Sequence, residues 1–536
     1  MTKPNVDLDP ERVPVIVGVG QINDRPEDPE DGLDSLGLMA AALHVADDDA
    51  GGVRRGGGPG WLDSIDSLAV VFQISWPQED DMAVALAERL EVAPAHCFTT
   101  PTASGDGPIR LLNEAANRIG EGVSKICAVV GAEALRSAAY FTRKAAAEGR
   151  ASDYKSIAEV AASRATPLRR RYGLLAPIDV YPLYENATRA AWGQTLAQAQ
   201  AETGEIWSRF AEVAAGNDGA WIRRGATAEE IVTPGPDNRP LAHPYTKLMV
   251  ANSSVNQGAG FIVTSLAEAR RRGVAEDRLV YVGRGAAAME TLDPLERDRY
   301  DRSTSMTLSL TRALDLNGID ADGAAAALDH VELYSCFPCV PKMARRVIGW
   351  PEDRPATVFG GLTFGGGPIG NYMSHAVVEM TERLRGGRDA DAAGEAGATA
   401  ALSPGMGLLF ANGGIATKNH AIVLSNAPIA SAAFPQEFDV QAEAEAVRDP
   451  VPPLAETAPG PARLETWTVF YDRKGAPRHG VVVAISDEGG ARTLARVPAE
   501  DAATLAFLTD GAAEPVGSRG VIEPGPDGDQ IWRRAG

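Results

Sequence analysis

The sequence predicts an α/β protein in which one α/β unit is used twice, followed by a small, mostly β domain. Three observations support this class. Short apolar runs, typical of buried strands, alternate with stretches of helical periodicity, as in proteins whose sheets are covered by helices. The order of these elements repeats in the second half of the chain. A segment rich in proline and alanine then separates the repeat from several short strand-like runs.

The first half of the predicted repeat spans residues 13–139. It begins with a valine-rich run over 13–20 that ends in glycine, which is typical of a buried strand. Pro108 suits the first turn of a helix, because that position needs no backbone N–H. The glycine-rich stretch 50–60 predicts a surface loop. We expect further strands over 65–72 and 126–131, and helices over 33–45, 82–90 and 108–119.

The pattern changes over residues 140–243. Aromatic residues such as Tyr181 and Trp207 become more frequent, and their spacing is irregular. This composition predicts an inserted region of helices and loops rather than another layer of sheet.

Regular alternation returns over residues 244–427, which we predict to be the second half. A glycine-rich loop over 360–370 fits neither the P-loop nor the dinucleotide-binding spacing. The expected strands are 259–265, 279–283, 330–337, 407–410 and 421–425, and the expected helices end near Arg272 or span 304–316, 340–348 and 371–384.

The end of the chain predicts a linker and a further domain. Residues 428–462 are rich in proline, alanine and glutamate, which is typical of a semi-rigid linker. Residues 463–536 predict the small β domain, with strands over 466–471, 480–486 and 492–497.

Charge and composition exclude several classes of function. The chain has 72 acidic and 51 basic residues, a formal charge of −21, which repels nucleic acid and anionic membrane surfaces. No apolar run approaches the length of a membrane span, and the first twelve residues are polar. Four cysteines are too few for a disulfide framework, so we predict a reducing, cytoplasmic location and no membrane partner.

Six segments in the same order and spacing resemble the thiolase superfamily. The resemblance is closest to the sterol-carrier-protein thiolases and the bacterial group called thiolase-like protein type 1, and it runs from about residue 13 to residue 427. The segments are Pro14–Gly20, Thr99–Pro108, Tyr245–Asn252 with Asn256–Ala259, Glu332–Phe337, Gly365–Gly370 and Ala411–Gly414.

This resemblance implies a thiolase fold. Two similar βαβαβαββ halves would form a five-layered α-β-α-β-α core, and the inserted region would cover a coenzyme A site. The domain after the linker resembles the C-terminal addition of the type 1 group. Thiolase relatives are usually dimers or tetramers, so a homodimer is implied, but the extra domain could cover the dimer face and leave a monomer.

The same resemblance implies that two catalytic residues are missing. The nucleophilic cysteine of the family falls on Thr102, whose hydroxyl is far less acidic than a thiol and needs an adjacent base to attack. The histidine of the Gly-His-Pro loop falls on Gly367, which has no side chain to act as a base. We therefore treat both positions as degenerate catalytic positions.

Three other positions retain polar or reactive side chains. The acid/base cysteine of ordinary thiolases falls on Ala411 or Asn412, and Tyr334 replaces the first polar residue of another catalytic loop. Cys336 matches the acid/base cysteine of the sterol-carrier-protein branch. It is either a proton-transferring or nucleophilic thiol, or a small residue at a tight strand end. Cys336 and Cys339 form a Cys-x-x-Cys pair without a second ligand pair, so no metal is predicted.

The coenzyme A segment of the family aligns with Ser254, Asn256 and Gln257, and the glycine loop brings Gly366 beside it. Tight approach of that loop to an acyl thioester explains its glycines. Exposed basic residues such as Arg223, Arg224 or Lys247 are candidates for contacts with the phosphates of coenzyme A. The histidines His330, His375 and His420 are interpreted as structural.

We predict from these residues a thiolase-like, acyl-CoA-binding protein of the acetyl-CoA acetyltransferase family, without classical thiolysis. The alternative is an active acyl-CoA acyltransferase or hydrolase that uses Cys336. Both imply coenzyme A or an acyl-CoA as ligand, no tightly bound cofactor, and a role in lipid metabolism.

Overall fold

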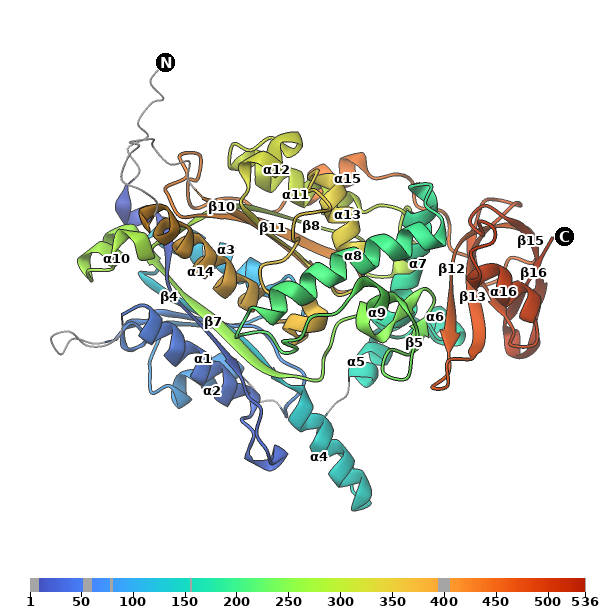
Figure 1. The fold of residues 1–536 in the computed structure, drawn as a ribbon, viewed down its shortest axis with the longest axis horizontal. Coiled ribbons are helices and arrows are strands. Elements are labelled where there is room, and N and C mark those ends of the chain that lie inside the picture. Colours follow the sequence, from blue (N-terminus) through green and yellow to red (C-terminus); the bar gives the residue numbers. More distant parts are fainter. Residues whose placement is uncertain (1–8, 52–59, 78–80, 155–156, 394–404, 536) are drawn as a thin grey trace.

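The computed structural model describes residues 9–51, 60–77, 81–154, 157–393 and 405–535. Its main body is built on a nine-stranded sheet, which Figure 1 shows crossing the molecule. The sheet consists of two groups of strands that meet between β1 and β8, where Val15 is opposite Tyr281 and Ile16 is opposite Val280. In sheet order the strands are β3 (His96–Thr99), β2 (Ser67–Val70), β4 (Ile126–Ala134), β7 (Asn256–Ser265), β1 (Pro14–Asn23), β8 (Val280–Met289), β11 (Lys418–Ser425), β10 (Met406–Gly413) and β9 (His330–Leu333).

The two strand groups and the helices that pack on them form five layers. Helices α3 (Gly107–Glu121) and α14 (Tyr372–Ala393) lie in the middle and contact strands of both groups. Helices α1 (Ser35–Asp49) and α2 (Met82–Arg89) cover the outer face of the first group. The outer face of the second group is covered by α11 (Thr304–Leu316) and α13 (Cys339–Val347), while α10 (Leu266–Arg271) and α12 (Ala324–Ala327) are short peripheral helices. The predicted α/β class and its α-β-α-β-α layering are confirmed.

Several elements differ from the sequence prediction. β3 was not predicted, because its four half-buried residues at the sheet edge show no alternation. The strand expected over 330–337 ends at Leu333, since the chain then turns away from β10. β7 pairs with β1 and β4 although it lies within the range 244–427. Most of the expected loop 50–60 falls outside the described residues.

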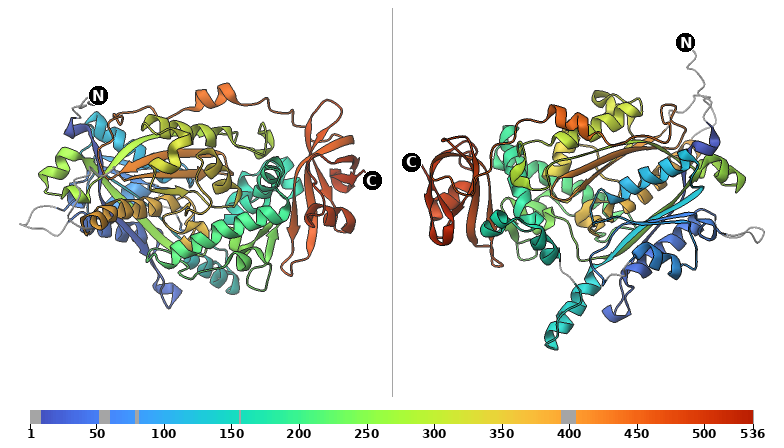
Figure 2. Two further views of the ribbon diagram at one scale, coloured as in Figure 1. Left: turned by 45° about the horizontal axis from the view of Figure 1, so that its top comes forward. Right: turned by 180° about the vertical axis from the view of Figure 1, so that it is seen from behind.

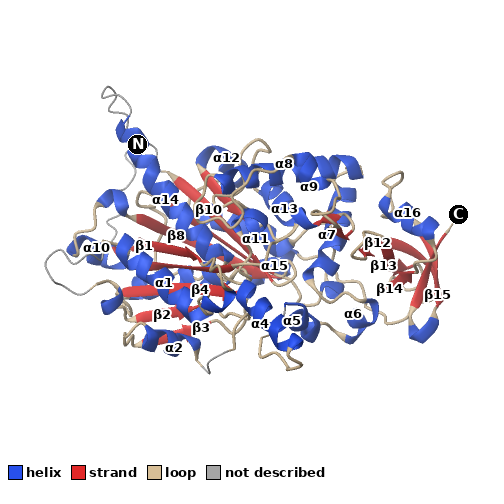
Figure 3. Ribbon diagram, turned by 60° about the horizontal axis from the view of Figure 1, so that its bottom comes forward, coloured by secondary structure: helices blue, strands red, loops and turns tan. Residues whose placement is uncertain are grey.

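The inserted region is helical and lies between the sheet and the C-terminal domain (Figure 3). Its helices are α4 (Leu135–Ala147), α5 (Ile157–Arg164), α6 (Pro167–Tyr172), α7 (Pro177–Ala191), α8 (Leu196–Ala215) and α9 (Ala228–Val232). α4 projects from the body, as Figure 1 and the right-hand view of Figure 2 show. α8 begins with a capping box, in which Thr195 and Gln198 exchange side-chain to backbone hydrogen bonds.

The C-terminal domain is a closed barrel at one end of the molecule (Figure 2). Closure follows because β12 pairs with both β13 and β15. Trp467 and Trp532 fill its core. Two short strands extend the sheet beyond β12: β5 (Pro240–Ala242), at the end of the inserted region, and β6 (Tyr245–Thr246), directly after it. The elements of the domain are β12 (Gly460–Tyr471), β13 (Pro477–Ser486), β14 (Arg492–Val497), α16 (Ala502–Thr509), β15 (Arg519–Pro524) and β16 (Gln530–Arg534).

The predicted small β domain is therefore confirmed, and β15, β16 and α16 are additions to the expected strands. The segment expected as a linker contains α15 (Gln441–Val447) and the first residues of β12. Arg448, at the end of α15, pairs with the buried carboxylate of Glu290 at 3.2 Å, so this segment is attached to the main body.

Candidate functional site

A cavity of about 560 Å³ opens where the two strand groups meet the inserted helices. The topology explains its position. β9 and β10 are parallel neighbours, so the loops that follow them leave the sheet at the same edge. The segments before α3 and α14 reach the same place, because these two helices form the central layer. The cavity wall therefore combines residues that are far apart in the chain.

Four of the sequence-predicted site residues line this cavity. They are Tyr334, Cys336, Gly367 and Asn412. The structure thus brings together the loop after β9, the glycine loop before α14 and the end of β10, as the resemblance implied.

Cys336 is partly exposed in the cavity wall and forms no disulfide. Its thiol interacts with the hydroxyl of Tyr181, which comes from α7 and whose ring stacks on the neighbouring Phe337 with 4.2 Å between ring centres. That hydroxyl also donates to Asn412 Oδ1 at 3.1 Å and accepts from the N–H of Ala416 at 2.9 Å. Burial raises the pKa of the Cys336 thiol to about 12, although the interaction with Tyr181 opposes the shift. The thiol is therefore protonated at neutral pH.

Tyr334 packs against the loop before α3. A Cβ atom at Gly105 would lie 2.4 Å from the Tyr334 hydroxyl and 2.3 Å from the carbonyl oxygen of Asn412, so only glycine fits there. Burial raises the pKa of Tyr334 well above its usual value. Its hydroxyl is thus a neutral hydrogen-bonding group at the cavity wall.

Thr102 and Gly367 have different positions relative to the cavity. Thr102 is half-buried in the loop between β3 and α3 and is not part of the wall. Ser104 lines the cavity instead, and its hydroxyl donates to Asp106. Gly367 lines the cavity, and its N–H donates to the Asn252 carbonyl at 2.8 Å.

No histidine is part of this wall within the described chain. His375 Nδ1 is hydrogen-bonded to Gln21 Oε1 at 2.8 Å, and His420 Nε2 to Asn113 Oδ1 at 3.2 Å. Burial lowers the pKa of each to about 3, so both imidazoles are neutral. Their contacts are those of core residues.

The residues expected along coenzyme A have internal partners. Asn256 bonds the hydroxyl of Ser137 at 2.9 Å, and Gln257 Nε2 donates to Asn23 and to the Gly365 carbonyl. Gly366 has a φ of +110°, and a Cβ there would lie 2.1 Å from Gln257 Oε1. Ser254 is exposed, whereas its neighbour Ser253 lines the cavity. None of the four expected residues is part of the cavity wall.

Sequence analysis missed Tyr181, Arg164 and Arg239, all of which line the cavity. They come from the inserted region, where the spacing carries no recognisable motif. Both arginines are exposed, and neither forms an ion pair with another described residue. The only hydrogen bond of the Arg239 guanidinium within the described chain is a 3.5 Å contact with the Pro240 carbonyl. Arg223, Arg224 and Lys247 do not line the cavity.

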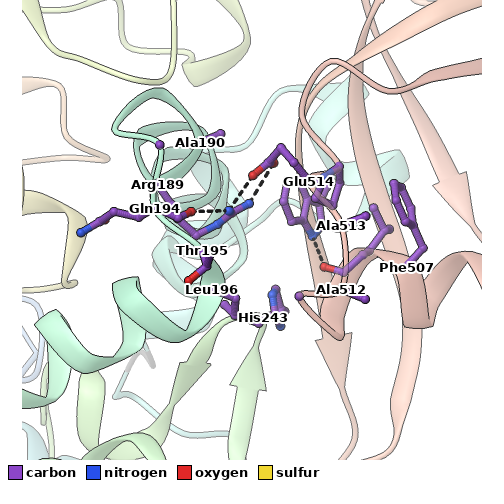
Figure 4. A pocket seen from close by; sticks show the side chains of 15 residues that line it. Arg189, Ala190, Gln194, Thr195, Leu196, His243, Phe507, Ala512, Ala513 and Glu514 are labelled. Carbon is purple, nitrogen blue, oxygen red and sulfur yellow. Dashed lines mark hydrogen bonds and ion pairs between the residues drawn. The ribbon is translucent and has the colours of Figure 1, made fainter.

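A second cavity of about 350 Å³ lies between the inserted helices and the barrel (Figure 4). Its wall contains an ion pair in which Arg189 contacts both carboxylate oxygens of Glu514, at 2.6 and 2.9 Å. None of the predicted site residues lines it.

Two further observations concern the described part of the chain. No three His, Cys, Asp or Glu side chains gather there in the manner of a metal site. None of the helices described combines the length and the apolar character that a membrane crossing requires.

Comparison with known proteins identifies the C-terminal region first. Residues 439–528 match the family model described as the thiolase-like protein type 1 additional C-terminal domain. No curated protein matches the chain.

One solved structure resembles nearly the whole chain, and others resemble about three quarters of it. A monomeric SCP2-thiolase like protein type 1 from Mycobacterium smegmatis is 28% identical, with a TM-score of 0.77 over 98% of this chain and 99% of that one. Human mitochondrial 3-ketoacyl-CoA thiolase in complex with CoA is 12% identical, with a TM-score of 0.54 over 78% and 98%. The Ltp2-ChsH2(DUF35) aldolase is 17% identical, with a TM-score of 0.55 over 77% and 98%. The last two share the fold.

Proposed function

Because the chain has the thiolase fold and ends in a type 1 additional C-terminal domain, we propose that it binds coenzyme A thioesters in the cavity around Cys336, without classical thiolysis. The observation that carries this proposal is a cavity with free arginines at its wall but no activated nucleophile. Arginine is well suited to phosphate groups, and the inner wall offers small and apolar groups for an acyl chain.

Classical thiolysis needs a thiolate to accept the acyl group and a base to generate it. Cys336 is protonated, and the cavity wall has no histidine among the described residues. Ser104 is paired with Asp106, but a serine hydroxyl needs a stronger activation than a single carboxylate hydrogen bond provides. The groups present are suited to hold a thioester rather than to cleave a carbon–carbon bond.

The alternative is acyl transfer or hydrolysis that uses Cys336. The interaction between Cys336 and Tyr181 favours it, because the hydroxyl could stabilise a thiolate once formed. This alternative requires activity that disappears in Cys336→Ala, whereas the binding function tolerates Cys336→Ser.

The testing experiment is calorimetric titration of the purified chain with coenzyme A and with acetoacetyl-CoA, while thiolysis is followed in the same samples. We expect saturable binding of both ligands and no turnover. Binding with turnover that is lost in Cys336→Ala would establish the alternative. Absence of binding would contradict the proposed function and leave only the shared fold.

Arg239→Ala is expected to weaken coenzyme A binding about tenfold, because one phosphate contact is lost. Calorimetry at low and at high salt measures the change, which should shrink as salt screens the charge. The matched control is Arg224→Ala, which removes an exposed arginine away from the cavity wall. Pantetheine, which lacks the phosphates, should bind wild type and Arg239→Ala equally. Equal weakening by both arginine variants would contradict a specific role for Arg239.

A further inference from the structure

The helix that carries Tyr181 is also attached to the C-terminal barrel. α7 presents the Tyr181 hydroxyl to Cys336 and Asn412, while residues further along the helix meet β12. Figure 1 shows α7 between the sheet and the barrel. The position of α7 is therefore determined from both sides.

Direct hydrogen bonds join α7 to β12. The buried hydroxyl of Thr466 donates to the Leu183 carbonyl at 2.6 Å, and Asn186 Nδ2 donates to the Trp467 carbonyl at 2.9 Å. Leu183 is only two residues from Tyr181. Any displacement of this part of α7 would therefore move the tyrosine hydroxyl relative to Cys336.

The end of α7 is attached to a barrel loop. Arg189 is almost fully buried and forms the two-fold ion pair with Glu514 that Figure 4 shows. A planar guanidinium that contacts both carboxylate oxygens fixes orientation as well as distance.

A second route from the barrel reaches the same hydroxyl. Arg492, in β14, is fully buried and donates to the carbonyls of Leu295, Arg297 and Asp298. Its guanidinium also lies 4.9 Å from the ring centre of Tyr300. The barrel thus holds the segment 295–300 of the main body in place.

That segment in turn holds the partner of Tyr181. Arg297 is buried, and its Nη2 donates to the Ala416 carbonyl at 2.7 Å. The N–H of Ala416 donates to the Tyr181 hydroxyl. Both routes from the barrel therefore end at one oxygen atom, which contacts the only thiol in the described cavity wall.

We propose that the C-terminal barrel maintains the geometry of the ligand cavity. Thr466 and Arg492 are the positioning residues that hold Tyr181 beside Cys336. The inference rests on the proposed function only in that it treats this cavity as the ligand site. It assigns the added domain an internal role, in which the barrel is needed for the geometry of the site.

The test uses Thr466→Val in the full chain, because valine keeps the shape of threonine and removes only the hydroxyl. Thr468→Val is the matched control. Thr468 lies two residues along the same strand, is equally buried, and its Oγ1 has no hydrogen-bond partner among the described residues. Thr466→Ser retains the hydroxyl and should restore wild-type behaviour. The readout is the rate of iodoacetamide modification at each cysteine, followed by peptide mass spectrometry at pH 8.5.

Tyr181→Phe should slow modification of Cys336 about two- to threefold, because the thiolate loses an O–H that can turn from Asn412 toward it, and the thiolate fraction falls. The higher nucleophilicity of a more basic thiolate offsets part of this loss. Thr466→Val should slow it by a similar factor, and the double variant should be no slower than Tyr181→Phe alone. Thr468→Val and Thr466→Ser should match wild type. Thermal unfolding checks that all variants are folded.

Three outcomes would overturn the inference: an unchanged Cys336 rate in Thr466→Val or in Tyr181→Phe, additive effects in the double variant, or an equal effect of Thr468→Val. A variant that merely loosens the fold would change the modification rates of all cysteines. The rate at Cys97 therefore serves as the internal reference. The assay contains no coenzyme A. Failure of ligand binding would therefore leave this result intact, and the two proposals can fail separately.

Discussion

Iodoacetamide at pH 8.5 should modify Cys336 about thirty- to fiftyfold more slowly than a cysteine of ordinary pKa. The thiol pKa is raised from 9.0 to about 12 by burial. This shift lowers the thiolate fraction about a thousandfold, while the higher nucleophilicity of a more basic thiolate recovers about twenty- to thirtyfold. Quantitative mass spectrometry of the alkylated peptides would measure the rate.

The control for this experiment is the same chain unfolded in urea, where the cysteines should react at similar rates. A Cys336 that reacts in the folded chain as fast as in the unfolded chain would contradict the raised pKa. It would also favour the acyltransferase or hydrolase alternative, because an activated thiolate is what that chemistry needs. Slow modification agrees with a cavity that holds a thioester without attacking it.

Lys342→Met is expected to lower the free energy of unfolding by about 3–5 kcal/mol. Lys342 is fully buried in α13, and its Nζ bonds Glu185 Oε1 at 2.7 Å and the Ala199 carbonyl at 3.0 Å. Methionine would leave the Glu185 carboxylate buried without its counter-ion. Glu185 lies on α7, so the unpaired carboxylate would also destabilise the helix that carries Tyr181. Urea unfolding followed by circular dichroism measures the change.

The double variant Glu185→Gln with Lys342→Met should recover most of this loss, because no charge then remains buried and the amide can still accept from Tyr245. The comparison pair is Arg110 and Glu114, one helical turn apart and largely exposed. Arg110→Met should cost at most about 0.5 kcal/mol. Equal losses from Lys342→Met and Arg110→Met would contradict the argument from burial.

The elements of the main body were predictable where local patterns are strong. The helix over 304–316 was predicted with both of its ends, and Ser303 caps it by accepting from the Met306 N–H. The elements that were missed have weak local signals. β3 is a short edge strand, and β16 contributes only Gln530–Arg534 to the barrel. Such strands exist because neighbours complete their hydrogen bonds, which a single segment does not reveal.

The candidate site was predictable in part, through the order of its motifs. Tyr334, Cys336, Gly367 and Asn412 meet at one cavity although they are up to 78 residues apart in the chain, from Tyr334 to Asn412. The tyrosine that interacts with Cys336 and the two arginines of the wall come from the insertion, and their spacing gave no indication of this role. Thr102 was predicted as a degenerate catalytic position, but it lies in the loop between β3 and α3 and is not part of the cavity wall, to which Ala103, Ser104 and Gly105 contribute.

The sequence by itself determined the α/β class, the doubled body and the separate β domain, and its motifs predict that the usual cysteine and histidine are replaced. Local periodicity, turn residues and motif order are sufficient for these, because each depends on neighbouring residues. Only the tertiary structure decided which side chains surround Cys336, the state of its thiol and the attachment of the barrel to α7. Burial and hydrogen bonding between distant segments set these properties, and both arise only when the chain is packed.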